Sequence, residues 1–154
     1  MEKRELIMGK KKYVNEVVYL TSDEIMSAFA QNDRQYLQGN LKREQELPYI
    51  HNENSEIGIS YYREYSHDDV HYHEKITETN YILEGKICMK IVDTGEEFVV
   101  EKGGIFSIPP KVPHILKAQP GTKIIFFKDY ATNDKRIVDA DTSELKEWLE
   151  DKEF

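Results

Sequence analysis

The sequence has one cysteine, few prolines and no long hydrophobic run. Cys88 has no partner for an intrachain disulfide, so nothing in the sequence requires an oxidising compartment. Its apolar neighbours favour a buried, structural thiol. The densest apolar run, residues 124–127, is far shorter than the roughly 20 residues of a membrane-spanning helix, and no segment has the pattern of a signal peptide. These absences predict a cytoplasmic protein that does not bind a membrane.

Positive charge is also scarce. The 154 residues include 21 Lys and Arg against 29 Asp and Glu, which gives a net charge of -8. A general nucleic-acid binder needs an excess of basic residues, so no nucleic-acid partner is expected. The one basic segment lies within residues 1–12, which we expect to be a frayed, solvated tail. The length and composition predict a single domain, residues 1–154, with a hydrophobic core of its own.

The segment from about residue 56 to residue 130 alternates short apolar runs with turn signals. Gly and Pro punctuate it at Glu84-Gly85, Gly103-Gly104 and Pro109-Pro110. Short strands at such close spacing are typical of an antiparallel sandwich or barrel. We therefore predict a mainly β protein whose barrel core covers residues 56–130. The polar stretch before it, residues 42–56, is predicted to be a loop with room for an edge strand.

One helix is expected on each side of this core. Thr21 and Glu24 have the spacing of a capping box at the start of a first helix, near the N-terminus. Residues 142–151 predict a second, C-terminal helix, in which Leu145, Trp148 and Leu149 form one apolar stripe.

The residues with the clearest chemistry lie in the stretch VHYHEKITETNYILEGK, residues 70–86. His71 and His73 are two apart on a predicted strand, so they share a face, whereas Tyr72 points the other way. Glu78 begins the next strand, which can return beside the histidines. Two imidazoles and a carboxylate directed at one point suit a divalent metal. His114, after a proline-rich turn, is a fourth candidate ligand.

The spacing of these residues resembles the two sequence motifs of the cupin superfamily. In the first motif, three or four residues separate His-x-His from a Glu, and six residues separate that Glu from a Gly. His71, His73, Glu78 and Gly85 match this spacing, with four and six residues in the two gaps. In the second motif, five residues separate a Gly from Pro-x-Gly, and two more residues separate Pro-x-Gly from a His.

The second motif is matched by Gly103, Pro109 and His114, and the matching region covers about residues 56–130. Three positions depart from the family pattern. Tyr65 and Lys111 stand where the family has glycines, and Ala118 stands where it has Asn. These are turn or support positions rather than ligand positions. Lys111 puts the turn in doubt, because Gly often serves where φ is positive.

The resemblance implies a small, single-domain, RmlC-like cupin: a double-stranded β-helix, or jelly-roll, barrel. It further implies that His71, His73, Glu78 and His114 coordinate one divalent transition metal. The donor set suits Fe, Mn, Ni, Co and Zn about equally, so the metal's identity stays open. A homodimer that pairs through the N-terminal segment is also expected.

Four further residues are candidates for the cavity around the metal. Tyr62 or Arg63, on the strand before the first motif, is a candidate acid, base or substrate anchor, because alternate residues of that strand face inward. Asn80 shares the strand face of Glu78, and Asp69 shares the parity of the two histidines. Both are therefore predicted to line the cavity.

Two classes of function remain open from the sequence. The first is a metal-dependent enzyme that acts on a small polar metabolite, such as a sugar or sugar derivative, as an isomerase, epimerase or lyase. With Fe(II), open coordination positions would instead suit a dioxygenase. The second class is a cupin that binds a small molecule without turnover. Metal-dependent turnover of a substrate would distinguish the classes.

Overall fold

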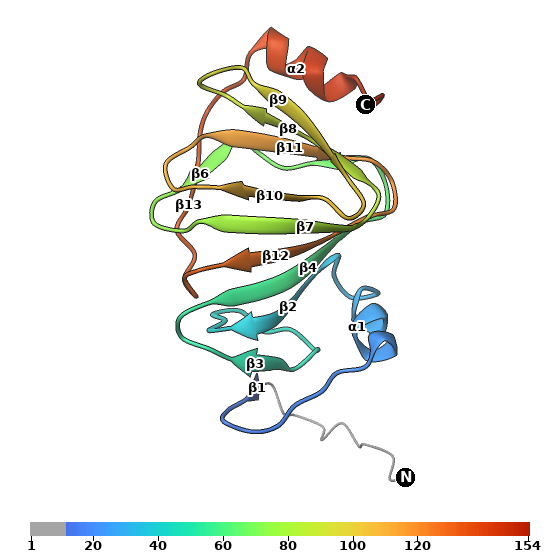
Figure 1. The fold of residues 1–154 in the computed structure, drawn as a ribbon, viewed down its shortest axis with the longest axis vertical. Helices are drawn as coiled ribbons and strands as arrows, with labels where there is room; N and C mark the ends of the chain where they lie inside the picture. The colour runs from blue at the N-terminus through green and yellow to red at the C-terminus, as the bar shows by residue number, and fades with distance from the viewer. Residues whose placement is uncertain (1–11) are drawn as a thin grey trace.

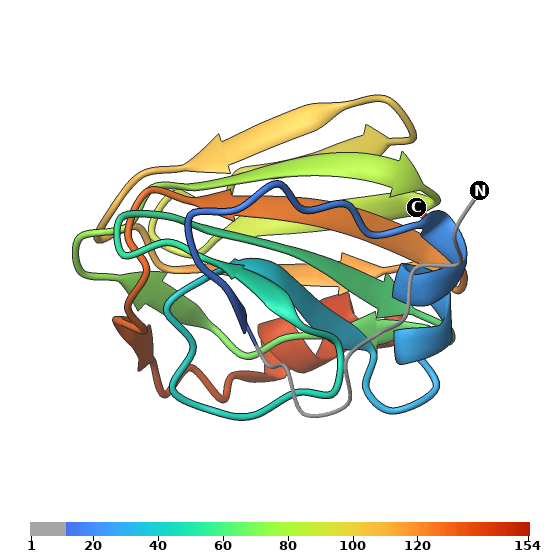
Figure 2. The same ribbon diagram turned by 90° about the horizontal axis from the view of Figure 1, so that it is seen from below.

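The structure is a computed structural model that describes residues 12–154. Its strands wind into a barrel of two sheets, drawn from two directions in Figures 1 and 2. The elements in chain order are β1 Lys12–Tyr13, α1 Ser22–Ala28, β2 Arg34–Gly39, β3 Tyr49–His51, β4 Glu56–Tyr62, β5 Ser66–His67, β6 His71–His73, β7 Glu78–Glu84, β8 Lys86–Ile91, β9 Glu97–Glu101, β10 Ile105–Ile108, β11 His114–Ala118, β12 Thr122–Lys128, β13 Lys135–Ile137 and α2 Ser143–Glu150.

Seven strands form one sheet in the order β1-β3-β2-β4-β12-β7-β10, and the other sheet runs β13-β6-β11-β8-β9, with β5 paired to β11. The predicted β-rich barrel with a helix near each terminus is confirmed. The pairing is not antiparallel throughout, because β3 runs parallel to both β1 and β2. Of these strands, β3 lies within residues 42–56, the segment expected to be a loop with room for an edge strand, whereas β1 and β2 come before it. Of the predicted tail, Lys12 lies in β1 and residues 1–11 are outside the described part.

The hydrophobic core lies between the two sheets and fills one part of the barrel. Strand alternation puts every second side chain on the inner face. The buried cluster comprises Ile82, Ile87, Met89, Phe106, Ile108, Leu116, Ala118 and Ile124. This alternation is clear in β7 and β10, because Ile82 and Phe106 are buried whereas Tyr81 and Ile105 are exposed.

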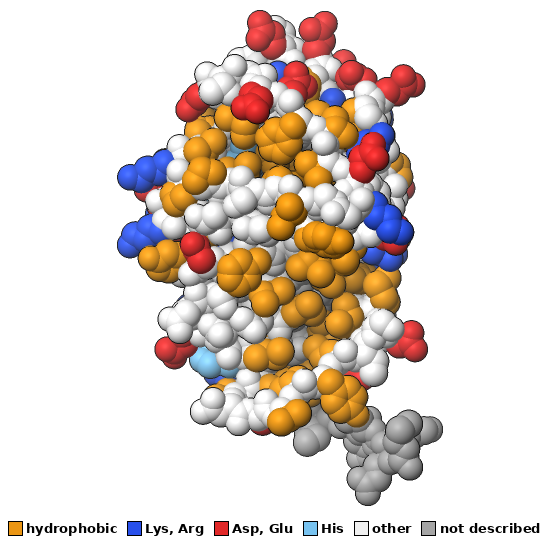
Figure 3. All heavy atoms as spheres, viewed as in Figure 1, with side chains coloured by type: hydrophobic (Ala, Val, Ile, Leu, Met, Phe, Trp, Pro, Cys, Tyr) orange, Lys and Arg blue, Asp and Glu red, His pale blue; other side chains and the backbone are white. Residues whose placement is uncertain are grey.

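The outer face of the seven-stranded sheet is partly apolar. Tyr81, Ile105 and Phe127 are all exposed there, and Ile105 lies opposite Tyr81 across the β10–β7 pair. Figure 3 shows hydrophobic side chains gathered on this side of the molecule. Among the helices of the described residues, neither is long and apolar enough to cross a membrane.

Helix α1 begins at its predicted cap, and α2 is capped by Thr142, the first residue of its predicted range. The Thr21 hydroxyl accepts a hydrogen bond from the Glu24 backbone N–H at 3.2 Å, which satisfies one of the free N–H groups of the first turn. Thr142 caps α2 in the same way, through the Leu145 N–H at 3.2 Å. The predicted segments therefore become helices of 7 and 8 residues, slightly shorter than the sequence pattern indicated.

Helix α2 packs on the outer side of the six-stranded sheet, at the top of Figure 1. Lys117 of β11 is only 2% exposed, and its ammonium donates to the carbonyls of Trp148 and Asp151, both at 2.6 Å. A cation at a helix C-terminus satisfies carbonyls that lack intrahelical partners and interacts favourably with the helix dipole. Tyr65, which replaces a motif glycine, also donates to the Leu149 carbonyl. Both contacts attach α2 to the barrel.

The turn before β11 keeps the conformation of the second motif without its glycine. Lys111 has φ 64°, in the left-handed region where glycine is usually found. Its N–H donates to the His73 carbonyl at 2.7 Å. A lysine thus adopts the backbone geometry that the family pattern assigns to glycine, and the turn still delivers His114 to the start of β11.

Candidate metal centre

Strand β6 presents two buried imidazoles to the inside of the barrel. His71 and His73 are 5% and 4% exposed, whereas Tyr72 between them is only half-buried, as the alternation predicts. The strand is held on both sides: β11 places His114 opposite His71, and β13 places Lys135 opposite His73. Backbone pairing on both edges fixes the direction of both rings.

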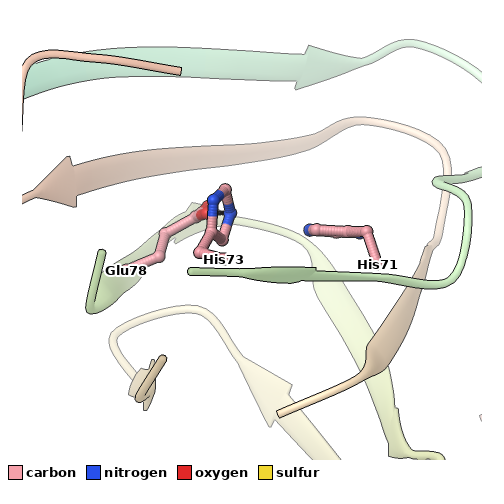
Figure 4. A group of neighbouring side chains, drawn as sticks. All are labelled: His71, His73 and Glu78. Atoms are coloured by element: carbon pink, nitrogen blue, oxygen red, sulfur yellow. Dashed lines mark hydrogen bonds and ion pairs between the residues drawn. The ribbon is translucent and has the colours of Figure 1, made fainter. Parts of the chain in front are cut away.

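Glu78 reaches the same point from the first position of β7. Its Oε2 lies 3.0 Å from His73 Nε2. One nitrogen or oxygen atom from each of His71, His73 and Glu78 lies within 4.8 Å of the others. Figure 4 shows His71 and His73 on one side of β6, with Glu78 directed at His73. The three side chains therefore form a group that could hold a metal ion.

His114 lies beside this group but does not belong to its closest set. It is 4% exposed, and its ring centroid is 4.4 Å from that of His71. Both rings line the same cavity. The structure therefore brings all four predicted ligands into one cavity, with three of them in immediate proximity.

Each histidine has its Nδ1 atom engaged away from the cluster. His71 Nδ1 lies 2.7 Å from the Asp69 carbonyl, and His114 Nδ1 lies 2.8 Å from the Val112 carbonyl. A carbonyl only accepts, so both Nδ1 atoms carry the proton and both Nε2 atoms keep a free lone pair. Metal-bound histidines commonly show this arrangement, because the second hydrogen bond fixes the tautomer and the ring direction.

His73 is oriented by a carboxylate rather than by a carbonyl. Its Nδ1 lies 2.9 Å from Asp134 Oδ1, and the other oxygen of Asp134 accepts from the backbone N–H groups of Lys75 and Ile76 at 2.7 and 3.1 Å. Although burial opposes it, the hydrogen bonds from Lys75, His73 and Ile76 lower the pKa of Asp134. The ionised carboxylate thus fixes both the ring of His73 and the bend between β6 and β7.

The protonation states of the cluster suit metal binding. Burial lowers the pKa of His71 to about 4, and it lowers the pKa of His114 as well. Both rings are therefore neutral at pH 7. Burial alone would raise the pKa of Glu78, but the hydrogen bond with His73 and the charges of Lys128 and Arg34 hold it well below its usual range. Neutral imidazoles and an ionised carboxylate are the forms that bind metals.

A cavity of about 80 Å³ adjoins the four side chains and is lined from both sheets. Asn80 and Tyr62 line it. Burial, followed by the nearby Asp68, raises the pKa of Tyr62 to about 12, so its phenol stays protonated. Asp68 is the second carboxyl group in the cavity, and burial raises its pKa to about 7. Its Oδ1 accepts from the Leu116 N–H at 2.8 Å, and its Oδ2 lies 3.8 Å from His71 Nδ1.

Two residues predicted near the metal lie elsewhere. Arg63 is outside the cavity and donates to Asp33 Oδ1 at 3.0 Å and to the Phe29 carbonyl. It follows the last residue of β4, Tyr62, which takes the inward position. Asp69 is exposed and offers only its carbonyl, to His71. The strand parity does not extend back to Asp69, because β6 begins at His71.

Four charged residues that surround the cluster were not predicted from the sequence: Arg34, Asp68, Lys135 and Asp134. Asp134 is 61 residues from His73, and no local pattern links the two. Arg34 lies in β2, before the segment that resembles the cupins. The only available signal was general: a buried histidine ligand usually requires an acceptor for its second nitrogen.

Comparison with known proteins identifies the fold. Residues 64–126 match the family model described as Cupin domain. This segment contains β6 to β11 with all four candidate ligands, so the resemblance to the cupin superfamily is confirmed over it. A search of curated protein sequences finds no match.

Solved structures agree on the fold. KdgF from Halomonas sp. has a TM-score of 0.51 at 17% identity, over 66% of this chain and 79% of that one. A variant of Streptomyces PAC13 solved with uridine has a TM-score of 0.51 at 11% identity, over 61% and 76%. A chain from the structures of the DMSP lyases RdDddP and RnDddQII has a TM-score of 0.54 at 14% identity, over 68% of this chain and 51% of that one. At these identities, only the fold is shared.

Proposed function

We propose that this cupin is a metal-dependent enzyme acting on a small polar metabolite, such as a sugar or sugar derivative, as an isomerase, epimerase or lyase. The observation that carries the proposal is the set of three Nε2 atoms and one carboxylate around a single cavity, with every histidine Nδ1 already engaged. The DMSP lyases are an example of lyase chemistry on a similar fold.

The donor set fits a divalent transition metal held by His71, His73, Glu78 and His114. When bound, such an ion would act as a Lewis acid on a carbonyl or hydroxyl group. The protein side chains would direct the ligand nitrogens, keep those of His71 and His114 neutral and restrict access to the ion. The buried histidines, all at most 5% exposed, support this role.

Tyr62 and Asp68 are the proposed proton-transfer groups, because both line the cavity beside the cluster. Isomerases, epimerases and lyases move a proton to or from carbon or oxygen, and this needs an acid or base within reach of the substrate. Tyr62, which keeps its proton, suits the role of donor. Asp68 suits the exchange of a proton in either direction.

Metal content tests the ligand assignment. Purified protein should contain about one transition metal per chain, and His73→Ala should remove most of it. His67→Ala is the matched control, because His67 is exposed on β5 and its Nδ1 bonds only to the Asp68 carbonyl. Full metal content in the His73→Ala protein would show that the cluster is not a metal site.

Turnover separates the enzyme from the binding module. The protein loaded with Mn, Fe, Ni or Zn is assayed against sugars and sugar derivatives in the absence of oxygen. Metal-dependent conversion without oxygen supports the proposal. Conversion only with Fe and oxygen would indicate a dioxygenase, and tight binding without conversion would indicate the non-catalytic module.

A further inference from the structure

Arg34 reaches into the cavity from β2, outside the segment that matches the cupin family. The sheet register puts it opposite Ser60 of β4, on the inner face. Its guanidinium carbon lies 4.2 Å from the ring centroid of Phe126, which comes from β12 beyond β4. The ring can lie there because position 58 is glycine: a Cβ at Gly58 would meet Phe126 Cζ at 2.2 Å. Gly58 and Phe126 thus form a flat support for the guanidinium.

The guanidinium has no hydrogen-bonding partner on this support. Its Nε atom is buried without a partner, and none of its nitrogens forms an ion pair within the described residues 12–154. The contact with the Phe126 ring, 4.2 Å from the guanidinium carbon, offers no hydrogen-bond acceptor from an oxygen atom, so the N–H groups can still donate to another group. A buried donor without a partner is costly, which makes an absent acceptor the simplest explanation.

The surroundings of Arg34 are basic although the protein as a whole is acidic. A second, outer pocket of about 320 Å³ shares Arg34, Lys128 and Lys135 with the metal cavity. Five basic residues and one acidic residue line this outer pocket: Arg34, Lys42, Arg43, Lys128, Lys135 and Glu56. Glu56 is paired with Lys128 at 3.2 Å. In a chain with net charge -8, this concentration of positive charge attracts anions to the cavity.

We propose that the metal cavity binds its substrate through an anionic group, a carboxylate or a phosphate, held by the edge of the Arg34 guanidinium. This inference rests on the proposed function, because it names the class of substrate for the same cavity. An Arg fork donates two parallel hydrogen bonds to either group. Lys135 lines both pockets and adds a second positive charge. The neutral part of the substrate then lies toward the histidine cluster.

Binding of matched small molecules tests the proposal. Glycerate, glycerol phosphate and glycerol share a three-carbon polyol skeleton and differ in their anionic group. Calorimetry on metal-free and metal-loaded protein should detect binding of glycerate or glycerol phosphate, but not of glycerol. Whichever of glycerate and glycerol phosphate binds with the higher affinity shows whether the site prefers a carboxylate or a phosphate. Affinity should fall as salt rises, as expected for charge attraction.

Arg34→Gln should weaken this binding by about 10-fold or more, in both metal-free and metal-loaded protein. Arg34→Lys keeps the charge but loses the fork and should recover only part of the affinity. Arg136→Gln is the matched control, because Arg136 lies on β13 with its side chain about half exposed. Equal binding of glycerol and the two anions, no binding of either anion, or unchanged affinity in Arg34→Gln would overturn the proposal.

The metal content of each variant distinguishes a failure of the proposed metal-dependent function from a failure of anion binding by Arg34. Arg34→Gln should keep the wild-type metal content, because no hydrogen bond or ion pair in the described residues joins Arg34 to a candidate ligand, and the His73 hydrogen bond and Lys128 still keep Glu78 ionised. If the wild-type protein bound no metal but still bound glycerate through Arg34, the proposed function would fail and this inference would stand. If metal bound normally and anions did not, only this inference would fail.

Discussion

Replacing Asp134 tests whether metal binding depends on the carboxylate that orients His73, and not only on the candidate ligands themselves. The carboxylate accepts three hydrogen bonds, from His73 Nδ1 and from the Lys75 and Ile76 N–H groups, at 2.7–3.1 Å. Asp134→Ala leaves all three donors without this acceptor. Asp134→Asn has one oxygen for two sets of donors, because its NH₂ group must face one set. Both changes therefore damage the support of His73, and Ala damages it most.

The size of the effect follows from these contacts. Each hydrogen bond to a charged acceptor contributes roughly 1.5–3 kcal/mol, but the donors partly recover bonds to water. We expect Asp134→Ala to lower the free energy of unfolding by about 2–4 kcal/mol, and the melting temperature by about 5–15 °C. Loss of such a carboxylate behind a histidine ligand typically weakens metal binding by about 10–100-fold.

Thermal unfolding of the metal-free protein and metal titration by calorimetry measure the two effects separately. Asp129→Ala is the matched control: Asp129 also accepts from a backbone N–H, that of Thr77 at 3.0 Å, but it touches no histidine. It should leave metal affinity unchanged. Wild-type metal affinity in the Asp134→Ala protein would refute the role of Asp134 in orienting His73, whatever happened to stability.

Two further predictions concern pH and the C-terminal helix. His71, with its pKa lowered to about 4, makes the metal-free protein more stable as pH rises from 4 to 6.5, because only the unfolded chain binds the extra proton there. Asp68, with its pKa raised to about 7, has the opposite effect between about pH 4 and 7, because the folded state keeps a proton that the unfolded chain loses. Asp68→Asn should therefore steepen the rise in stability between pH 4 and 6.5 by up to about 1.4 kcal/mol per pH unit; denaturant titrations that gave equal slopes would contradict the opposed shifts. Lys117→Met should lower the free energy of unfolding by about 2–4 kcal/mol and expose α2 to hydrogen exchange, because the Trp148 and Asp151 carbonyls lose their buried donor. Unchanged hydrogen-exchange protection of α2 in the Lys117→Met protein would show that these hydrogen bonds do not hold the helix on the barrel.

Most of the barrel could be predicted from the sequence, because helix caps and strand alternation depend on residues that are close together in the chain. Thr21 caps α1 through a contact three residues away, and the alternation that buries Phe106 while exposing Ile105 is visible within one strand. The candidate ligands could also be predicted from the sequence, since His71, His73 and Glu78 fall within eight residues and His114 follows a recognisable turn. Local periodicity and family spacing were sufficient for both.

The remaining features depend on contacts that local patterns do not encode. Asp69 was predicted to line the cavity because strand parity was extended past the point where β6 begins, whereas Asp68 lines it. Arg63 was a candidate together with Tyr62 because the sequence does not show which of two neighbouring residues faces inward, and only Tyr62 lines the cavity. The parallel pairing of β3 with β2 depends on where the chain returns after a long connection, which is set by tertiary packing.

The position of Arg34 on β2 has a consequence for how such proteins diverge. The candidate ligands belong to β6, β7 and β11, whereas the guanidinium comes from an N-terminal strand at the other side of β4. Exchange of that strand, or a single substitution in it, can alter which molecules enter the barrel while the reactive centre stays intact. Two cupins with the same metal chemistry can therefore differ in selectivity through residues that neither sequence motif contains.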